Sequence, residues 1–312
     1  MNEPLLVDLV GVGLNATDTL ISLPEYPARG SKVKYSQVSI LPGGQTASAV
    51  MACQTWGLST RYVGKLGDDD AARLHQREFA RVGVDAQVVT VQGAQSPQSL
   101  ILVDEGGERT VLNLRDERLL LRPEDLERSW ITNARCLHVD GLETAAATQA
   151  AKWAHEAGIP VVADLDEMYE GVDELLQCVD YLIVSRDFPR MLTGERELET
   201  ALRAMKVNYG CTVTGATLGQ EGVLAWDGAQ FHHRPAWRVP VADTTGAGDV
   251  FHAGFIYGLL QGWPLSRRLD FACAAAALNC TRSGARGGIG PIAEVETLMA
   301  TAGRHALAPA AE

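Results

Sequence analysis

The chain has 312 residues, of which 46% are hydrophobic, 21% charged and 6% aromatic, and its formal net charge is −12. The apolar fraction excludes a disordered or collagen-like polymer, and the length suits one large α/β domain with a sizeable core. The acidic balance argues against binding to nucleic acid or to an anionic membrane surface, although local N–H groups can still bind a small anion.

The cysteines and the N-terminal stretch indicate where the protein works. None of the six cysteines forms a C-x-x-C pair, which is typical of reduced thiols in a cytoplasmic protein. Residues 1–10 lack a basic start, and the chain has no run of about 18 apolar residues that could cross a bilayer. We therefore expect a cytoplasmic protein without a signal peptide or a membrane span.

Short apolar strands alternate with helices along most of the chain. The pattern predicts helices over 44–56, 69–82, 123–132 and 144–157, and strands over 61–64, 87–91, 136–139, 160–164, 181–184 and 212–218. Such alternation predicts a mainly parallel sheet that is covered by helices on both faces.

Two half-polar segments interrupt this alternation. Residues 32–41 alternate as a strand does, and residues 99–114 indicate a hairpin around a turn at 105–108. We expect a small β layer that excludes water from a pocket, with ordinary surface hairpins as the alternative. The expected lid covers residues 12–42 and 96–115, and the expected large domain covers 1–11, 43–95 and 116–312.

The first glycine motif is Gly11-Val-Gly13-Leu-Asn-Ala16, which formally matches a dinucleotide fingerprint after a strand. The residues that follow make a poor helix, and the acid expected about 20 residues further on is missing, so we reject dinucleotide binding. Asn15 and Asp18 then belong either to a ligand site at the end of the first strand or to an ordinary turn.

A second glycine motif, Gly43-Gly44, precedes Gln45 and the first long helix. Paired glycines let a ligand approach the N–H groups at a helix start. By itself this signal is weak, because many loops contain two adjacent glycines.

The strongest motif lies between a strand expected to end at Val241 and a helix expected to run to about Gln261. Gly246, Ala247 and Gly248 can turn successive N–H groups toward one point at the positive end of that helix, which suits a transferring phosphoryl group. The helix dipole favours the ionised form of Asp249, so we expect a carboxylate at neutral pH that accepts a proton from an attacking hydroxyl. A plain helix start would explain Asp249 but not the glycines before it.

Residues 243–254, D-T-T-G-A-G-D-V-F-H-A-G, match in full the signature of the ribokinase-like sugar kinases of the phosphofructokinase-B type. The chain resembles this family over residues 5–300 and looks closest to the ketohexokinase and sulfofructose-kinase branch, through residues 96–99, 107–109, 249–252 and 279–289. The resemblance implies a ribokinase-like three-layer α/β/α sandwich with a mainly parallel central sheet and a small β-sheet lid.

The same resemblance implies roles for individual residues. Asp249 would be the base on the sugar hydroxyl, and the amides of Gly246, Ala247 and Gly248 would form the anion hole. The residues implied at the sugar are Asn15, Asp18, Gly43, Gly44, Gln45, Ser48 and Asp249, with Arg115 either pairing an anionic substituent or lying solvated. Those implied along the nucleotide are Ser185, Thr217, Gly219, Gly222, Gly246, Gly248 and Asn279. Asp243 and Thr245, with carbonyls at 284–290, match loops that hold a monovalent cation in some members.

Two positions depart from the family pattern. Ser48 stands where many members have an Asn that contacts sugar hydroxyls. Residues 185–188, Ser-Arg-Asp-Phe, replace the usual N-x-x-E near Mg²⁺ and the phosphates, which leaves Asp187 as a substitute acid.

The resemblance implies an ATP- and Mg²⁺-dependent kinase that phosphorylates a primary hydroxyl of a ketose-type, fructose-like sugar, with K⁺ as a further cofactor in some members. The alternatives are a kinase for 2-keto-3-deoxygluconate, sulfofructose, ribose or a nucleoside, and a non-catalytic sugar- or nucleotide-binding regulator on the same fold. Besides sugar and ATP, we expect a second copy of the chain as partner, because the lid strands alternate apolar residues on one face.

Overall fold

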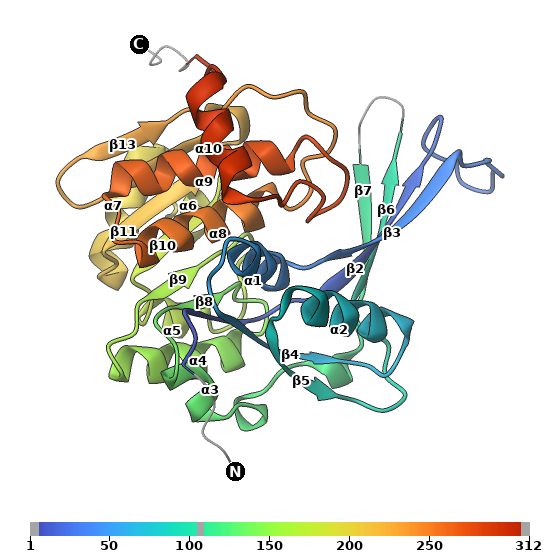
Figure 1. The fold of residues 1–312 in the computed structure, drawn as a ribbon, viewed down its shortest axis with the longest axis horizontal. Helices are drawn as coiled ribbons and strands as arrows, with labels where there is room; N and C mark the ends of the chain where they lie inside the picture. Colours follow the sequence, from blue (N-terminus) through green and yellow to red (C-terminus); the bar gives the residue numbers. More distant parts are fainter. Residues whose placement is uncertain (1–5, 105–108, 307–312) are drawn as a thin grey trace.

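The computed structural model describes residues 6–104 and 109–306. A 9-stranded sheet forms the middle layer, in the order β13-β12-β11-β10-β9-β8-β1-β4-β5 (Figure 1). Its strands are β1 (Leu9–Val12), β4 (Thr60–Leu66), β5 (Asp85–Thr90), β8 (Leu137–Val139), β9 (Val161–Ala163), β10 (Tyr181–Ser185), β11 (Val213–Thr217), β12 (Val223–Trp226) and β13 (Phe231–Arg234). The pairs from β5 to β11 are parallel, and β12 and β13 add antiparallel strands.

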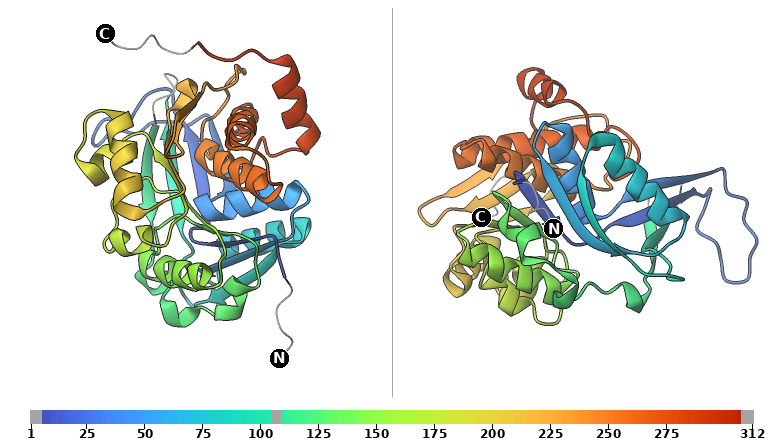
Figure 2. Two further views of the ribbon diagram at one scale, coloured as in Figure 1. Left: turned by 90° about the vertical axis from the view of Figure 1, so that its left-hand side faces the viewer. Right: turned by 60° about the horizontal axis from the view of Figure 1, so that its bottom comes forward.

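Helices cover both faces of this sheet, so the predicted mainly parallel and doubly covered sheet is confirmed (Figures 1 and 2). One core contains side chains of α3 (Arg128–Thr132), α4 (Thr144–Glu156), α5 (Val172–Leu176), α6 (Phe188–Thr193) and α7 (Leu198–Tyr209). The other contains those of α1 (Gln45–Thr55), α2 (Asp70–Val82), α8 (Ala247–Leu260), α9 (Leu265–Asn279) and α10 (Ile292–Thr301). The central strands β1, β8 and β9 are buried at every residue, because both of their faces lie under helices.

A second, 4-stranded sheet projects from the body, in the order β3-β2-β6-β7 (Figure 2). Its strands are β2 (Ala16–Ser22), β3 (Gln37–Gly43), β6 (Gln98–Val103) and β7 (Arg109–Leu114). β2 pairs in parallel with β6, whereas the two outer pairs are antiparallel. The small sheet therefore joins two distant segments of the chain, and we call it the lid.

Four expectations about elements need correction. The segment after Ala16, where no strand was expected, forms β2, because its pairing with β3 and β6 outweighs its polar composition. The strand expected over 32–41 begins only at Gln37. The helix expected over 123–132 is a 3₁₀ turn, η2 (Pro123–Asp125), followed by α3, because an extended backbone at Leu126 lets that side chain reach the core. Val241 is exposed and lies in irregular chain, not at the end of a strand. The predicted turn at 105–108 falls outside the described residues.

The sheet order places a ligand crevice beside β1. β1 pairs with β4 on one side and with β8 on the other, so connections leave it in opposite directions. Open α/β sheets bind ligands where the strand order reverses, outside the carboxyl ends of the strands. No helix in the described part of the chain is long and apolar enough to cross a membrane.

Candidate active site

Buried acids follow two neighbouring strands at the carboxyl edge of the sheet. Asp140, after β8, accepts hydrogen bonds from the Leu14 N–H (2.6 Å) and the Thr46 hydroxyl (2.8 Å). It thereby fixes the segment after β1 against the start of α1. Asp164, after β9, faces α8, with its Oδ2 3.2 Å from Nδ1 of His252. These acids anchor the loops that carry the predicted site residues.

The end of the loop before α8 and the start of this helix carry the three residues that were predicted to bind an anion. Gly246 has a φ of +74°, and a Cβ there would overlap the backbone of Ala285, so this turn requires glycine. No side chain caps the helix, and the Val250 N–H donates to the Gly246 carbonyl (3.0 Å). The amides of Gly248 and Asp249 precede that bond, at the end of the helix where an anion would bind. Ala247 differs from the prediction, because its N–H donates to the Thr244 carbonyl (3.2 Å).

Asp249 lies half-buried in the first turn of α8, and its protonation differs from our expectation. Burial and the nearby Asp164 carboxylate raise the pKa of Asp249 to about 7, although His252 and Arg286 oppose this rise. The helix dipole therefore does not dominate, and the ligand-free protein at neutral pH holds both protonation states. A base with a pKa near the working pH suits proton transfer.

His252, one helical turn after Asp249, is a buried cation. Its Nδ1 lies 2.9 Å from the Gly248 carbonyl, and its Nε2 lies 2.7 Å from the Ile183 carbonyl. Carbonyl oxygens only accept hydrogen bonds, so both ring nitrogens carry a hydrogen. Burial opposes this charge, but Asp164 and the two carbonyls raise the pKa of His252 to about 9. The His252–Asp164 pair thus supports the turn that carries Asp249.

The glycine pair Gly43-Gly44 brings the lid against the end of β1. A Cβ on Gly43 would overlap the Asp18 carboxylate, and Gly44, with a φ of +93°, packs on the backbone of Asn15. Burial raises the pKa of Asp18 to about 6, against the effect of Arg286. The predicted sugar residues Asn15, Asp18, Gly43 and Gly44 therefore lie together.

Ser48 is fully buried and serves as a hydrogen-bond acceptor inside the protein. Its Oγ accepts from Nε of Arg286 (3.1 Å), and Nη2 of the same guanidinium donates to Asn15 Oδ1 (3.2 Å) and to the Gly43 carbonyl. Arg286 therefore occupies the hydrogen-bonding position on Ser48 where a sugar hydroxyl was expected.

A cavity of about 180 Å³ lies between the lid and the body, and Gln45 and Arg115 line it. Gln45 donates to Asp166 Oδ2 (3.2 Å). Arg115 pairs with Glu143 (2.5 Å), so its charge is already balanced inside the protein. This pairing removes the simplest reason to assign Arg115 to an anionic substituent of the substrate.

A second cavity, of about 440 Å³, lies between η3 (Gly219–Glu221) and the helices α8 and α9. The predicted nucleotide residues Thr217, Gly219, Gly222 and Gly248 line it, together with Ala247. Its other walls are largely apolar, including Trp237, Val239, Val241, Phe251, Ala276 and Ala277. An apolar slot that ends at a helix N-terminus suits a flat base joined to phosphates.

Three predicted nucleotide residues do not line this cavity, namely Gly246, which forms the turn before α8, Ser185 and Asn279. Ser185 ends β10, and its Oγ lies 3.5 Å from the Asp166 carbonyl. Asn279 is fully buried: its Nδ2 donates to the carbonyls of Thr245 (3.2 Å) and Ala285 (3.0 Å), and its Oδ1 accepts from the Gly288 N–H (3.0 Å). Asn279 therefore joins the two loops beside the anion site, and it does not line the cavity.

The same two loops contain the predicted cation ligands. Asp243 accepts hydrogen bonds from the N–H groups of Thr245 (2.9 Å) and Gly284 (2.8 Å). A carbonyl oxygen has two lone pairs, so the carbonyls of Thr245 and Ala285 keep one each beyond the bond from Asn279. Oxygen donors beside one carboxylate fit a monovalent cation, which makes these loops suitable for it.

The residues that replace N-x-x-E offer little to Mg²⁺. Phe188 is fully buried in the core, and Asp187 lies exposed at the start of α6. The described residues contain no group of three or more His, Cys, Asp or Glu side chains that could hold a metal. Mg²⁺ in kinase sites usually relies on substrate phosphates, waters and one or two carboxylates, which needs no such group of side chains.

Sequence reasoning missed Arg286, His252, Asp140 and Asp164 as site residues. For the two acids a signal was present, since a charged residue directly after a buried strand must have a partner at the sheet edge. For Arg286 and His252 no local pattern shows which distant groups they meet.

Comparison with known proteins gives the family. Residues 11–290 match the pfkB family of carbohydrate kinases. The chain is 29% identical to the ATP-dependent ribose-1-phosphate kinase of Halopiger xanaduensis over 78% of this chain and 82% of the relative. It is 28% identical to the fructokinase of Klebsiella pneumoniae over 78% of this chain and 87% of that protein.

Solved structures agree on the fold. The crystal structure of ribokinase from Thermotoga maritima superposes with a TM-score of 0.84, covering 95% of this chain and all of that one, at 24% identity. The expected ribokinase-like fold, a large mostly parallel sheet between helices with a small second sheet, is confirmed. The described geometry and the family match together show that this chain belongs to the pfkB family of carbohydrate kinases, which are phosphotransferases with an alcohol group as acceptor.

Proposed function

We propose that this protein transfers the γ-phosphoryl group of ATP to a primary hydroxyl of a ketose-type sugar, with Asp249 as the base. The observation that carries the proposal is the position of Asp249 in the first turn of α8. It directly follows Gly248, which lines the nucleotide cavity, and it interacts electrostatically with Asp18 and Arg286 on the sugar side. A carboxylate there can accept a proton from an attacking hydroxyl, while the amides of the first turn stabilise charge on the transferred group.

The nucleotide side of the proposal rests on the cavity lined by Thr217, Gly219, Gly222 and Gly248. The apolar walls would take the base, and the first turn of α8 would receive the phosphates. The Halopiger relative is named as ATP-dependent, which supports ATP as the donor.

Mg²⁺ would be held by the phosphates, by water and by Asp166, which lines the lid cavity and contacts Gln45 (3.2 Å) and Tyr169 (2.9 Å). When bound, the ion would neutralise charge on the phosphates. K⁺ or a similar ion would lie between the loops of Asp243 and Ala285, where it would strengthen the positive potential at the anion site.

The sugar side rests on the cluster of Asn15, Asp18 and the glycine pair. The amide of Asn15, after β1, and the carboxylate of Asp18, on the lid strand β2, can pair with sugar hydroxyls. A ketose such as fructose remains our proposed substrate, supported by the similarity to a fructokinase and by the residues shared with the ketohexokinase branch.

A homodimer through the lid is a further part of the proposal. Pairing registers place Ile40, Thr19, Leu100 and Leu112 in one row across the lid, on the face opposite Asp18. Ile40 and Leu112 are 64% and 51% exposed. Such an apolar sheet face favours burial against a second copy.

A coupled assay of ADP release across a sugar panel tests the proposal. The panel contains fructose, ribose, adenosine, 2-keto-3-deoxygluconate and sulfofructose, with a no-sugar control. Sugar-dependent ADP release that is highest with fructose would support the proposal. A non-catalytic regulator would bind ligand in a thermal-shift assay but release no ADP above the control, and that result would contradict it.

A further inference from the structure

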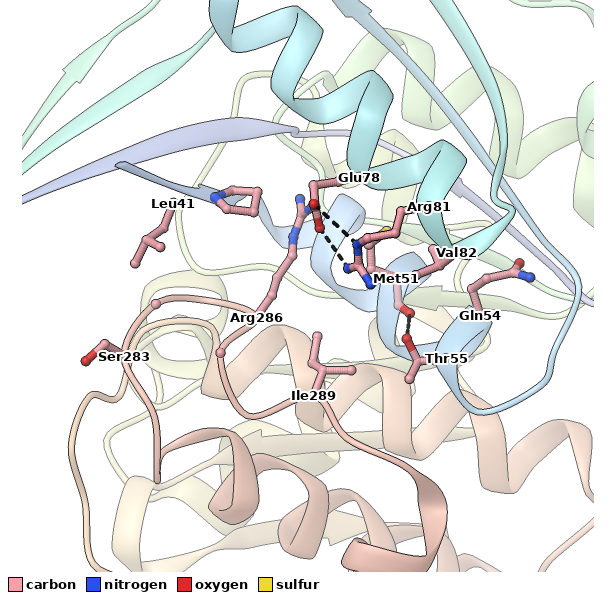
Figure 3. A pocket seen from close by; sticks show the side chains of 13 residues that line it. Leu41, Met51, Gln54, Thr55, Glu78, Arg81, Val82, Ser283, Arg286 and Ile289 are labelled. Atoms are coloured by element: carbon pink, nitrogen blue, oxygen red, sulfur yellow. Dashed lines mark hydrogen bonds and ion pairs between the residues drawn. The ribbon is translucent and has the colours of Figure 1, made fainter. Parts of the chain in front are cut away.

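Arg286 links three segments of the sugar side through one guanidinium. It lies in the loop between α9 and α10, and its side chain extends toward α1 and α2 (Figure 3). Its Nε donates to Ser48 on α1, and its Nη2 donates to Asn15 after β1 and to the Gly43 carbonyl at the end of β3. In the sequence, Arg286 is separated from Ser48 by 238 positions, from Asn15 by 271 and from Gly43 by 243.

Two donors in this cluster lack an acceptor. Nη1 of Arg286 and Nδ2 of Asn15 are buried, and neither has a hydrogen-bond partner within the described ranges. Asn15 as a whole is only 2% exposed. A buried donor without a partner costs about 1–3 kcal/mol, and more when it is charged, so native proteins seldom leave one without a purpose. The two donors belong to one hydrogen-bonded pair of side chains, next to Asp18 and Gly43.

We propose that Arg286 is a specificity-determining residue of the sugar site, and that its Nη1, together with Nδ2 of Asn15, donates to oxygen atoms of the sugar. This proposal rests on the proposed kinase function. The short side chain of Ser48 makes room for the guanidinium and accepts its Nε–H. In family members that have Asn at this position, the Asn amide contacts the sugar hydroxyls; here Arg286 supplies that donor from a different element.

The surrounding charges decide the substrate class. Asp249, Glu78 and Asp18 all interact electrostatically with Arg286, so one cation faces three carboxylates, two of them on the sugar side. Around the lid cavity, Arg115 is paired with Glu143, and Asp166 and Glu167 add further negative charge. An acid or sulfonate substituent would meet this excess of carboxylates, and desolvated like charges repel strongly. The site therefore fits an uncharged sugar with adjacent hydroxyls, one donating to Asp18 and one accepting from Arg286.

The surface behind Arg286 offers a matched control. A cavity of about 470 Å³ there is lined by Arg286 itself and by Glu78 and Arg81, whose ion pair measures 2.8 Å (Figure 3). Arg81 is largely exposed, with 62% of its side chain accessible, and its guanidinium donates to Glu78. Arg81→Met thus changes the same residue type nearby and leaves the bonds of Arg286 to Asn15, Gly43 and Ser48 in place. Glu78, which also interacts electrostatically with Arg286, loses its ion pair with Arg81 in this variant.

The experiment compares wild type, Arg286→Met, Arg286→Lys, Ser48→Asn, the double variant S48N/R286M and Arg81→Met. With fructose and with 2-keto-3-deoxygluconate, kcat and the KM values for the sugar and for ATP are measured. The shift of the melting temperature that each sugar causes in the absence of ATP is measured as well. Loss of a charge-assisted hydrogen bond should raise the sugar KM of Arg286→Met by about 10- to 100-fold. We expect the KM of Arg286→Met for ATP to be unchanged. The sugar KM should be partly restored in S48N/R286M and intermediate in Arg286→Lys. Both KM values should equal those of wild type in Arg81→Met.

The outcomes separate this proposal from the kinase function. A wild-type sugar KM in Arg286→Met would overturn the role of Arg286 even if the protein is a kinase. If Arg286→Met does not fold, a wild-type sugar KM in Arg286→Lys would overturn that role. Preference of the wild type for the acid sugar would overturn the uncharged substrate class. If no sugar promotes ADP release, the kinase proposal fails. A sugar-induced shift of the melting temperature that disappears in Arg286→Met or Arg286→Lys would then still support Arg286 as a sugar ligand. A shift that persists in both variants would refute that role of Arg286.

Discussion

His252 and Asp164 form a buried ion pair, with Nδ1 and Oδ2 3.2 Å apart, beneath the first turn of α8. His252 is 1% exposed and Asp164 6%. The pair joins the end of β9 to the helix that carries Asp249, so the charge state of His252 affects both the stability of the fold and the position of the base.

We expect the His252→Phe variant to be less stable by about 3–5 kcal/mol, because it leaves Asp164 as an unpaired buried charge. The pKa of His252 is raised from its ordinary 6.5 to about 9, so its contribution is fully present below pH 6.5 and is lost as the pH rises through about 9. Urea unfolding at several pH values should show a decline in this range that is smaller in the variant.

His138 provides the matched control for this prediction. Its ring stacks on His252 at 5.7 Å between centroids, and burial and the charge of His252 lower its pKa to about 4. His138→Phe should therefore keep the alkaline decline. Equal declines in wild type and His252→Phe would contradict a charged His252.

Gly246 and Gly248 should respond differently to alanine. A Cβ on Gly246 would overlap the backbone of Ala285, and alanine at this position would have to keep a positive φ, which costs about 1–2 kcal/mol for the backbone alone. Gly246→Ala should therefore lose both stability and turnover. A Cβ on Gly248 meets nothing within 4 Å, and the residue lines the nucleotide cavity, so Gly248→Ala should fold normally but bind ATP less tightly. Melting curves and calorimetric ATP titration would check both; a normal ATP affinity in Gly248→Ala would argue against this placement of the phosphates.

The two loops at Asp243 and Ala285 should make the activity depend on a monovalent cation. Asn279→Ala removes the partner of the half-buried Thr245 carbonyl and of two buried backbone groups, the Ala285 carbonyl and the Gly288 N–H. Each buried group without a partner costs about 1–3 kcal/mol. We expect wild-type turnover to rise with KCl but not with N-methylglucamine chloride, and Asn279→Ala to lose this response. Equal turnover in both salts would refute the cation site.

The exposed apolar face of the lid should hold a dimer together. Ile40→Glu and Leu112→Glu should give monomers in sedimentation experiments, because a buried carboxylate opposes association. Val111, which is 45% exposed but points to the opposite face of β7, supplies the control: Val111→Glu should remain dimeric. A monomeric wild type would contradict the proposal.

The sequence predicted best what depends on neighbouring residues. The turn at Gly246 and the helix after it follow from local glycine and helix-start patterns, and the buried strands follow from apolar runs. The pKa of Asp249 could not be predicted, because it depends on burial and on Asp164, which lies on another strand. The role of Arg286 could not be predicted for the same reason, because its hydrogen bond to Ser48 spans 238 positions of the chain.

β2 shows the same limit within the fold. Threonine favours strands, but Thr17, Asp18 and Thr19 are all polar and so lack the alternation of apolar and polar side chains that marks a strand. The strand exists because β3 and β6 pair with it on both sides. Local propensity yields to such tertiary pairing.

The base assignment has a pH signature. With a pKa of about 7 in the ligand-free protein, Asp249 must lose its proton to act, so kcat/KM should fall as the pH drops below about 7. A pH–rate profile with fructose and saturating ATP would check this, and a flat profile between pH 5.5 and pH 8 would contradict it.

The most direct measurement is sugar-dependent ADP release by Asp249→Asn beside wild type, with ATP affinity determined by calorimetry on both proteins. The account predicts turnover lower by about 10²- to 10⁴-fold, as expected for loss of a general base, with ATP affinity retained. Turnover of the variant within a few-fold of wild type would contradict the assignment of Asp249 as the base.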